Sequence, residues 1–581
     1  MKRIAVRKTT SKGIVAGRVF LHKPMALKAD TALVGKDSVG GEKDSFLDAV
    51  SHAKAQLSEL AKVSDIFMAH LDVADDPALR ESVMGKIENE LKNAELAVEE
   101  SAKEIAALFE ETGDGFLAER AQDVLDVCSR IMRCLKGVGG SGFGPIHEPV
   151  VLVARDLRPS DTAAMDKDKV LGLITANGGE TSHVAIMAKG LGIPAIVGVE
   201  GIDNEVRDGG GIILDAVEGT IILDPDEKTL EEYGEKRRAF ESRRETLSRL
   251  KGLPATTTDG HTVGLAVNVG SIRDAQEMVA HGIRGIGLLR SEFLYMEGSS
   301  FPPEGDQFAA YKACTEIATD GVIVRTLDIG GDKGLPYFRP PKEENPYLGF
   351  RGIRLSLGNP GLFRTQLRAI LRASAFGKIR ILYPMVSQVD ELRQANSLLA
   401  ECMAELTAEK APFDPDIKKG VMIETPAAVM LADDLARECD FFSIGSNDLT
   451  QYVLAVDRGN LKVAPLYDPF SPAVIRSIAR TVEAGHANGI HVHLCGDLAG
   501  NDAAIPILIG LGLDGLSMPG SLIPEARYVI RNTSMSEARA LALKASSLQC
   551  ASEVRELILG QGTDAQGAPG NATGKGGPAC P

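Results

Sequence analysis

Residues 420–448, GVMIETPAAVMLADDLARECDFFSIGSND, decide the fold of the C-terminal half of the chain. Two short β-rich runs, 420–424 and 441–445, stand on either side of a helical stretch, a pattern that favours two parallel strands joined by a helix. Polar side chains stand at the ends of these runs: Glu424, Asn447 and Asp448. Because the active sites of barrels built from such units lie at the strand carboxyl ends, we expect these side chains to share a site.

The same alternation continues in both directions from this stretch. From residue 256 onward, eight candidate strands alternate with helical stretches: 263–269, 285–288, 323–328, 379–384, 420–424, 441–445, 491–495 and 515–518. Eight strands with intervening helices over about 290 residues predict a (β/α)8 TIM barrel that spans residues 256–545.

Cationic side chains and one thiol also collect near the strand ends of the predicted barrel. Four arginines stand at strand ends or in the loops that follow them: Arg290, Arg325, Arg351 and Arg458. Cys495 ends the seventh strand. Arginine forks suit bidentate capture of phosphate and carboxylate. Magnesium prefers one or two carboxylates together with substrate oxygens, and Glu424 and Asp448 supply that number.

The N-terminal part predicts a smaller α/β domain interrupted by a helical insertion. Residues 1–30 and 140–225 contain short β-rich runs and a hairpin signal around residues 216–219. Between them, residues 31–130 hold 22 acidic and 10 basic side chains, which is −12 of the net charge of −16. Apolar residues recur there at helical spacing: Leu47, Val50, Ala53, Leu57, Leu60, Val63 and Ile66. We expect a helical subdomain over 31–139, whose acidity indicates either a solvated surface or docking of a basic partner.

A second candidate site lies in the α/β domain, where residues 178–183 read GGETSH. The glycines permit a tight turn, and Thr181 or Ser182 can cap a short helix predicted from His183 to Lys189. The positive end of that helix would stabilise a phosphate on His183 and keep its imidazole neutral, which is the nucleophilic form. A lone histidine in a loop is usually structural, but this combination indicates a phosphate-carrying nucleophile.

The remaining segments and the composition narrow the range of functions. Residues 226–255 predict a charged linker helix, and residues 546–581 a C-terminal extension that is disordered at least from residue 560. The acidic balance argues against nucleic-acid binding. No apolar run approaches ~18 residues, so membrane insertion is not expected. Eight cysteines without a CxxC pair and no signal-peptide pattern fit a cytoplasmic location.

Several of these stretches resemble one enzyme family. GGETSHVAIMAKGLGIPAIVG (178–198) is similar to the phosphohistidine signature of enzymes that take phosphate from phosphoenolpyruvate. The barrel stretches GIGLLRSEFL (285–294), VMIETPAA (421–428) and HLCGDLAG (493–500) resemble enzyme I of the bacterial phosphoenolpyruvate–sugar phosphotransferase system. The similarity covers roughly residues 10–545. It implies a phosphohistidine α/β swivelling domain with an inserted α-helical subdomain, followed by the TIM barrel.

The resemblance also implies a reaction and a role for each candidate residue. Phosphoenolpyruvate would phosphorylate His183, which would pass the phosphoryl group to a histidine of the phosphocarrier protein HPr and release pyruvate. The substrate would be held by Arg290, Arg325, Arg351, Asn447, Asp448 and Arg458. Mg2+ would be bound by Glu424 and Asp448, Cys495 would donate a proton to the enolate carbon, and Thr162 would orient His183. The family further implies a homodimer formed through the barrel.

Two features favour enzyme I over the ATP-using members of this superfamily. Only 182 residues precede His183, and no GxxxxGK[ST] loop is present, which leaves no room for a nucleotide-binding domain. Residues 66–79, IFMAHLDVADDPAL, are similar to the segment with which enzyme I docks HPr. The docking candidates are His70, Asp72, Asp75 and Asp76.

Departures from the family pattern leave two alternatives open. The Cys-Gly-Glu of the family is Cys495-Gly496-Asp497 here, and we expect the shorter carboxylate to loosen the support of Cys495. One alternative is a magnesium-dependent barrel lyase acting on pyruvate or oxaloacetate, which would have no use for His183. The other is a protein that binds HPr without catalysis.

Overall fold

The computed structural model describes most of the chain: residues 1–6, 9–22, 28–61, 66–110, 115–138, 146–157, 161, 165, 168–179, 182–296, 298, 300–330, 335, 337–338 and 343–565. The chain forms two compact units that divide between Arg244 and Glu245. This division falls inside the predicted linker helix.

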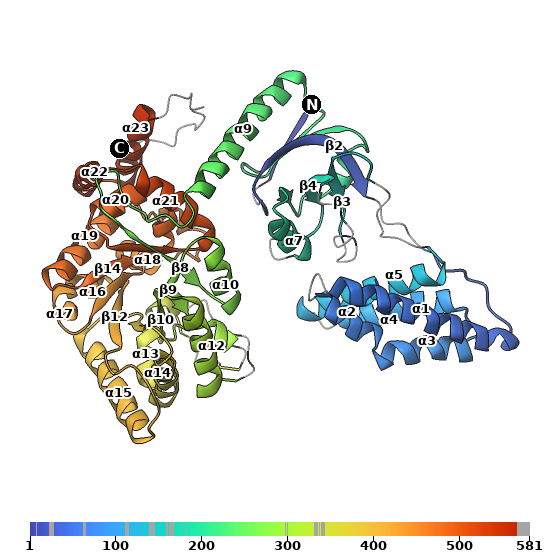
Figure 1. The fold of residues 1–581 in the computed structure, drawn as a ribbon, viewed down its shortest axis with the longest axis horizontal. Coiled ribbons are helices and arrows are strands. Elements are labelled where there is room, and N and C mark those ends of the chain that lie inside the picture. The colour runs from blue at the N-terminus through green and yellow to red at the C-terminus, as the bar shows by residue number, and fades with distance from the viewer. Residues whose placement is uncertain are drawn as a thin grey trace. The chain divides into compact units, whose positions relative to one another are not determined.

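The first unit contains a seven-stranded sheet with the strand order β1-β7-β6-β2-β3-β4-β5 (Figure 1). The strands are β1 Lys2–Ala5, β2 Ile14–His22, β3 Val150–Ala154, β4 Val170–Thr175, β5 Ala195–Ile196, β6 Gly211–Asp215 and β7 Thr220–Leu223. Strands β2 to β5 pair in parallel, and every residue of the apolar β3 is buried. The predicted hairpin is confirmed, because β6 and β7 pair antiparallel with Asp215 opposite Thr220. Helices α7 His183–Leu191 and α8 Ile202–Glu205 follow β4 and β5.

Five helices lie in the chain between β2 and β3, after a short 3-10 turn η1 (Lys36–Ser38). They are α1 Val39–Ala61, α2 Ile66–Ala74, α3 Pro77–Asn89, α4 Ala94–Glu110 and α5 Gly115–Leu135. Apolar side chains from all five form a separate core that includes Phe46, Leu57 and Ile131. The insertion is therefore helical, as predicted, and has a hydrophobic core of its own.

The buried face of α1 differs by one position from the predicted pattern. Leu47 is 38% exposed, whereas Phe46 is 1% exposed and packs in the core. The aromatic side chain buries more apolar surface than leucine, so the helix turns Phe46 inward. Leu60 lies in α1, which the structure describes to Ala61, and Ile66 begins α2. Val63 lies outside the described residues.

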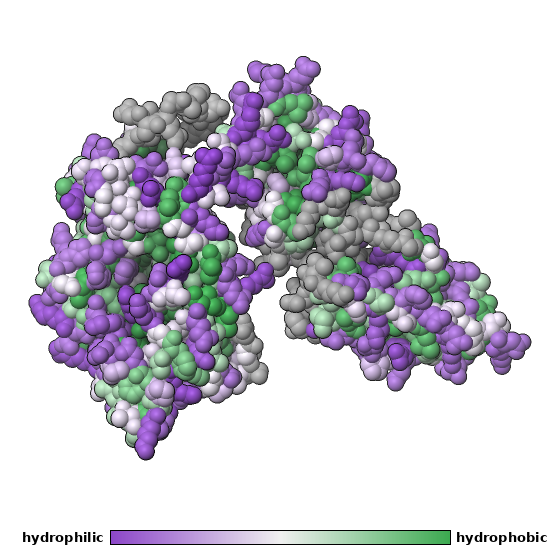
Figure 2. Space-filling view, viewed as in Figure 1, coloured by the Kyte–Doolittle hydropathy of each residue, from purple (hydrophilic) through white to green (hydrophobic). Residues whose placement is uncertain are grey.

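Helix α9 (Glu227–Arg249) spans the division between the two units. Its buried residues, Thr229 and Tyr233, both lie in its first two turns. Most of its remaining surface is charged, and Figure 2 shows it as strongly hydrophilic. A helix with so little apolar contact depends on its own helix-forming residues and on i,i+4 ion pairs such as Arg249–Glu245.

The second unit is a closed barrel of eight parallel strands in the order β10-β11-β12-β13-β14-β15-β8-β9 (Figure 1). The strands are β8 Gly264–Val269, β9 Gly285–Arg290, β10 Gly321–Arg325, β11 Ile379–Tyr383, β12 Lys418–Ile423, β13 Phe441–Ile444, β14 His491–Leu494 and β15 Gly515–Met518. All eight predicted strands are present, which confirms the TIM barrel. The third strand begins two residues earlier than predicted and ends at Arg325, three residues before Asp328.

The barrel strands alternate with helices that bury their apolar faces on the outside of the barrel. These helices are α10 Ile272–Ala280, α11 Phe293–Met296, α12 Glu304–Ile317, η2 Pro346–Leu348, α13 Gly352–Gly358, α14 Pro360–Ser374, α15 Val389–Ala408, α16 Pro426–Met430, α17 Ala432–Ala436, α18 Ser446–Leu454, η3 Ala464–Leu466, α19 Pro472–Ala487, η4 Asp497–Gly500, α20 Ile505–Gly510, η5 Gly520–Leu522, α21 Ile523–Arg531, α22 Met535–Ser547 and α23 Ala551–Ala565. Strand and helix side chains together form one large core.

The last helix corrects the prediction for the C-terminal extension. Helix α23 runs to Ala565, so the backbone is helical through the first six residues that were predicted to be disordered. Val554 is fully buried against the barrel core, and Leu557 and Ile558 pack partly buried beside it. This anchoring carries the helix past Gly560. Among the described residues, no helix combines the length and apolar content that a membrane crossing requires.

Candidate active site

A polar cavity of about 300 Å³ opens at the carboxyl ends of the barrel strands. It is lined by the predicted site residues Arg290, Arg325, Arg351, Glu424, Asn447, Asp448, Arg458 and Cys495. Each comes from a strand end or the loop after it, so the parallel register of the barrel brings together residues up to 205 positions apart.

Two of the arginines are buried and held by carboxylates. Arg325 forms an ion pair with Glu292 and lies 3.2 Å from Asp328 Oδ2. Arg351 donates to both oxygens of Asp328, from Nε at 3.1 Å and from Nη2 at 2.8 Å. Burial alone would lower the pKa of each guanidinium, but the neighbouring carboxylates outweigh it and raise both. Both cations are therefore fixed in position and permanently charged.

Glu292 and Asp328 are site residues that the sequence analysis missed. Each is at most 3% exposed, and together they neutralise the two buried arginines. The signal was available, since Glu292 follows Arg290 by two positions and Asp328 ends the predicted third strand. The sequence does not give the distances between side chains on different strands, and only the folded barrel places these two acids beside Arg325 and Arg351.

The two predicted metal ligands are also buried. Glu424 Oε1 accepts a hydrogen bond from Met385 N at 2.7 Å, and burial together with Asp448 and Asp328 raises the pKa of Glu424 above its usual range. Asp448 Oδ1 accepts no hydrogen bond from the described residues, and its ion-pair partner Arg458 Nη2 is 3.4 Å away. An orphaned carboxylate oxygen beside a second, mutually repelling carboxylate fits a divalent cation.

This pair is small for a metal site made of protein ligands alone. No group of three His, Cys, Asp or Glu side chains is arranged to hold a metal ion within the described part of the chain. Two carboxylates are sufficient for magnesium only when substrate oxygens complete the coordination. The arrangement therefore fits a metal that binds together with an anionic substrate.

Cys495 lines this cavity directly after β14 and is 3% exposed. Burial raises the pKa of its thiol to about 11, so the thiol is protonated at neutral pH. Its backbone N–H donates to Ile444 O at 3.0 Å. Asp497 N donates to Asn447 Oδ1 at 2.8 Å, which turns the Asn447 amide nitrogen away from the loop and leaves it available as a donor.

The loop also settles what the shorter carboxylate at position 497 changes. We expected Asp497 to loosen the support of Cys495. Instead, residues 495–497 are held by hydrogen bonds from their backbone atoms and from Cys495 Sγ, which donates to Ile444 O at 3.6 Å. A Cβ at Gly496 would collide with the Ser446 hydroxyl. The loop is therefore closely packed, and the hydrogen bonds that hold it among the described residues do not involve the side chain at 497.

The GGETSH segment begins α7 as predicted. Ser182 is the N-cap residue, and its hydroxyl accepts from Ala185 N at 3.3 Å. Gly178 has φ = 103°, a backbone conformation in which a residue with a side chain would be strained. The helix ends at Leu191, two residues beyond the predicted end at Lys189, and Gly192 follows in the left-handed conformation. His183 is the first helical residue, while its side chain, and the whole of Thr162, lie outside the described residues.

Comparisons with known proteins match this architecture along the chain. Three models of PEP-utilising enzymes match: the N-terminal domain over residues 8–120, the mobile domain over 146–219 and the PEP-binding domain over 244–535. The phosphoenolpyruvate-protein phosphotransferase of Staphylococcus carnosus is 42% identical, covering 94% of this chain and 97% of that protein. Those of Geobacillus stearothermophilus and Bacillus subtilis are 42% and 41% identical, and each is covered to 98%.

The chain belongs to the phosphoenolpyruvate-protein phosphotransferase family, enzyme I. The mobile-domain match includes His183, so a barrel lyase, which needs no such domain, does not account for the whole chain.

The candidate docking residues of this enzyme I have different environments. His70 is fully buried, with Nε2 3.1 Å from Asp123 Oδ1 and Nδ1 3.7 Å from Asp126 Oδ2. The prediction that it docks a partner is wrong, because its side chain packs in the helical core against two carboxylates. A sequence pattern alone cannot distinguish a buried histidine from an exposed one.

The three acidic candidates all lie at the surface. Asp75 pairs with Lys54 Nζ at 2.5 Å, and Asp76 caps α3 by accepting from Ala78 N at 2.8 Å. Asp72 is exposed on α2. Of the four candidates, Asp72 is therefore the one best placed to contact another protein.

Proposed function

We propose that this enzyme I transfers the phosphoryl group of phosphoenolpyruvate to His183 and then to a histidine of HPr, releasing pyruvate, as the first step of the sugar phosphotransferase system. The observation that carries the proposal is the barrel cavity, in which four arginines surround two buried carboxylates and a protonated thiol. The matched mobile domain supplies the nucleophile.

The substrate is a trianion that needs fixed positive charge at both ends. Arg290, Arg325, Arg351 and Arg458 bind its phosphate and carboxylate, and their planar forks suit both groups. Asn447 donates to a phosphate oxygen through its free amide nitrogen. Since Arg325 and Arg351 are already held by Asp328, they are oriented before the substrate arrives, which lowers the cost of reorganisation.

Phosphoryl transfer and proton transfer follow in that order. The His183 imidazole attacks phosphorus, a nitrogen–phosphorus bond forms, and the bond from phosphorus to the enol oxygen breaks with its electron pair remaining on oxygen. The Cys495 thiol then gives its proton to C3. The electron pair of the carbon–carbon double bond forms the new C–H bond, the C2 oxygen becomes a carbonyl, and the thiolate regains a proton from solvent.

We assign the divalent metal of this reaction as Mg2+, held by Glu424 and Asp448. When bound, it supplies positive charge opposite the phosphoryl and enolate oxygens. We also propose that Thr162 orients His183, that Asp72 on α2 belongs to the HPr-docking surface with Asp75 and Asp76 beside it, and that the barrels of two copies form a dimer. Because one imidazole serves both the barrel and HPr, the α/β domain moves between them, with α9 as the connecting segment.

The test is labelling with phosphoenolpyruvate that carries radioactive phosphorus, with Mg2+, on wild type and His183→Ala. Acid-labile, base-stable label on the wild type alone supports a phosphohistidine at His183. Addition of HPr should then remove that label. Absence of label from both proteins would refute the proposal and favour a protein that binds HPr without catalysis.

A further inference from the structure

Asn268 connects the proton-donor loop, residues 495–497, to β8, which is separated from β14 by the single strand β15. It lies near the end of β8, and its Nδ2 donates to the carbonyl oxygen of Cys495 at 2.9 Å. The backbone N–H of Cys495 is held separately by Ile444 O at 3.0 Å. The two peptide groups that flank the Cys495 Cα are therefore fixed from different strands. Their orientation sets the direction of the Cα–Cβ bond, and Sγ itself donates to Ile444 O at 3.6 Å.

The orientation of the Asn268 amide is itself fixed. Ser517, on the adjacent strand β15 and 3% exposed, donates from Oγ to Asn268 Oδ1 at 2.7 Å. A Cβ at Gly287 would collide with Ser517, so that glycine keeps the space the serine occupies. A donor on one side of the amide and an acceptor on the other allow only one of its two flipped forms.

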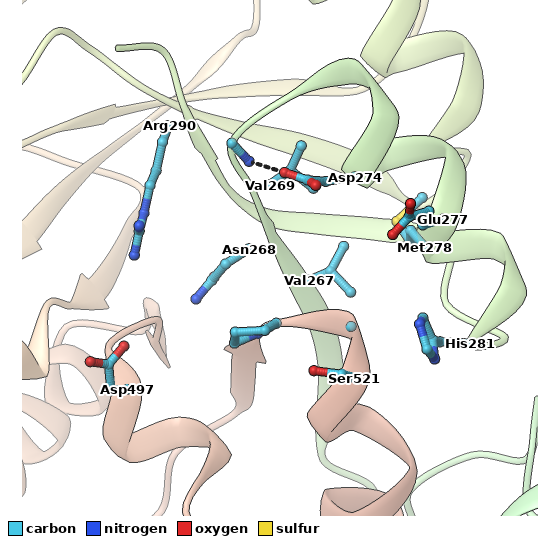
Figure 3. Close-up of a pocket in the computed structure, with 13 residues that line it drawn as sticks. Val267, Asn268, Val269, Asp274, Glu277, Met278, His281, Arg290, Asp497 and Ser521 are labelled. Atoms are coloured by element: carbon cyan, nitrogen blue, oxygen red, sulfur yellow. Dashed lines mark hydrogen bonds between the residues drawn. The ribbon is translucent and has the colours of Figure 1, made fainter. Parts of the chain in front are cut away.

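Asn268 does not line the catalytic cavity. It lines a neighbouring pocket of about 410 Å³, which shares Arg290 and Asp497 with that cavity. Figure 3 shows Asn268 extending from β8 into the space between Arg290 and Asp497. Asn268 therefore contacts the loop from the neighbouring pocket, whereas Cys495 lines the catalytic cavity.

We propose that Asn268, oriented by Ser517, is a positioning residue that directs the Cys495 thiol toward C3 of the enolate. This inference rests on the proposed role of Cys495 as proton donor. Loss of the Asn268 hydrogen bond frees the Cys495 carbonyl and lets the thiol move. A displacement of about 1 Å costs roughly 100-fold in a step that depends on orientation. The phosphoryl transfer to His183 precedes this step and does not use the thiol.

Asn268→Asp is the variant that tests this. It keeps the size of the side chain and the bond from Ser517, but it places an oxygen opposite the Cys495 carbonyl. We expect labelling of His183 to stay within about threefold of wild type. Pyruvate, followed continuously with lactate dehydrogenase, should lag behind the label, because unprotonated enolpyruvate leaves the site and becomes pyruvate only in solution. The protonation step should slow by about 100-fold.

Further variants separate positioning from a general structural defect. Ser517→Ala leaves the Asn268 amide free to turn, so pyruvate should lag behind the label by less than in Asn268→Asp. Asn532→Asp is the matched control. Asn532 Nδ2 also donates to a backbone carbonyl, Tyr528 O, at 2.8 Å, but this bond lies away from the loop. The control variant should therefore show no lag between label and pyruvate. Adding Asn268→Asp to Cys495→Ala should cause no further loss, because both changes act on one proton transfer.

The outcomes distinguish the inference from the proposed function beneath it. If the wild type takes no label, the proposed function fails. If Cys495→Ala shows a lag and Asn268→Asp does not, the positioning role fails and the reaction stands. Equal loss of label and pyruvate in Asn268→Asp, together with a lower melting temperature, would reduce Asn268 to a structural residue. A further loss in the double variant would refute action through Cys495.

Discussion

Asp328→Asn tests whether one buried carboxylate holds two catalytic arginines in place. Asp328 is 1% exposed, accepts two hydrogen bonds from Arg351, and lies 3.2 Å from Arg325 Nη1. The asparagine has nearly the same shape but no charge. It leaves Arg351 with Asp448 at 3.4 Å and Arg325 with Glu292.

The size of the effect follows from burial. Removing one partner of a buried ion pair typically costs about 3–5 kcal/mol, because less negative charge then remains to balance the buried cations. Unfolding entropy near ~2.1 cal/mol/K per residue corresponds to roughly 0.6 kcal/mol/K for a barrel of about 290 residues. The melting temperature of the barrel should therefore fall by about 5–8 °C.

Differential scanning calorimetry measures this fall, and Asp434→Asn is the matched control. Asp434 Oδ1 also lies 2.8 Å from an arginine, Arg437, but both side chains are more than half exposed. Surface pairs contribute at most about 1 kcal/mol, so this variant should lose less than about 2 °C. If the melting temperature of Asp328→Asn falls no further than that of Asp434→Asn, Asp328 does not hold the two arginines. The rate of His183 labelling should fall as well, since both arginines lose their fixed orientation.

Three further predictions concern single residues. Arg290→Ala should prevent labelling by phosphoenolpyruvate but permit back-transfer from phosphorylated HPr, which uses no barrel residue; loss of both reactions would count against two separate sites. The pKa of Cys495 is raised from 9.0 to about 11, so near neutral pH it carries about 100-fold less thiolate than an unshifted thiol. Iodoacetamide should therefore modify the exposed Cys550 first, and the rate of Cys495 modification should rise about tenfold per pH unit up to pH 11. Equal modification rates for the two cysteines, measured by mass spectrometry, would contradict this. Asp72→Asn should slow phosphoryl transfer to HPr, and the effect should be larger at low salt. His70→Ala should instead lower the melting temperature of the helical insertion, because His70 is buried. Transfer kinetics at two ionic strengths and a melting curve distinguish these two effects.

The fold was largely predictable because its signals are local. Each barrel strand is a short, mostly apolar run, and eight such runs that alternate with helical stretches define the barrel without any knowledge of contacts. The errors occur where packing decides between neighbours. Phe46 rather than Leu47 enters the helical core, and α23 continues past Gly560 because Val554 and the residues after it pack on the barrel.

The candidate site was predictable in its charged ligands and not in what supports them. Arginines and carboxylates at strand ends point to a substrate because charged groups there need a partner. Glu292 and Asp328 occupy equally visible positions, but their function is to neutralise arginines on other strands, which depends on distances the sequence does not contain. His70 is the converse case, since a residue in a motif-like segment is buried and pairs inside the helical core.

The loop at residues 495–497 is held mainly by atoms other than the side chain at 497. Position 497 carries Asp where the family pattern has Glu, which suggested weaker support for Cys495. The loop is held through its backbone: Asn447 accepts from Asp497 N, and Asn268 donates to Cys495 O. Any residue except proline presents the same N–H at 497. We therefore expect substitutions at positions 268 and 447, whose side chains bind the loop from other elements, to disturb the loop more than a substitution at 497. A comparison restricted to the loop's own side chains would overlook these two residues.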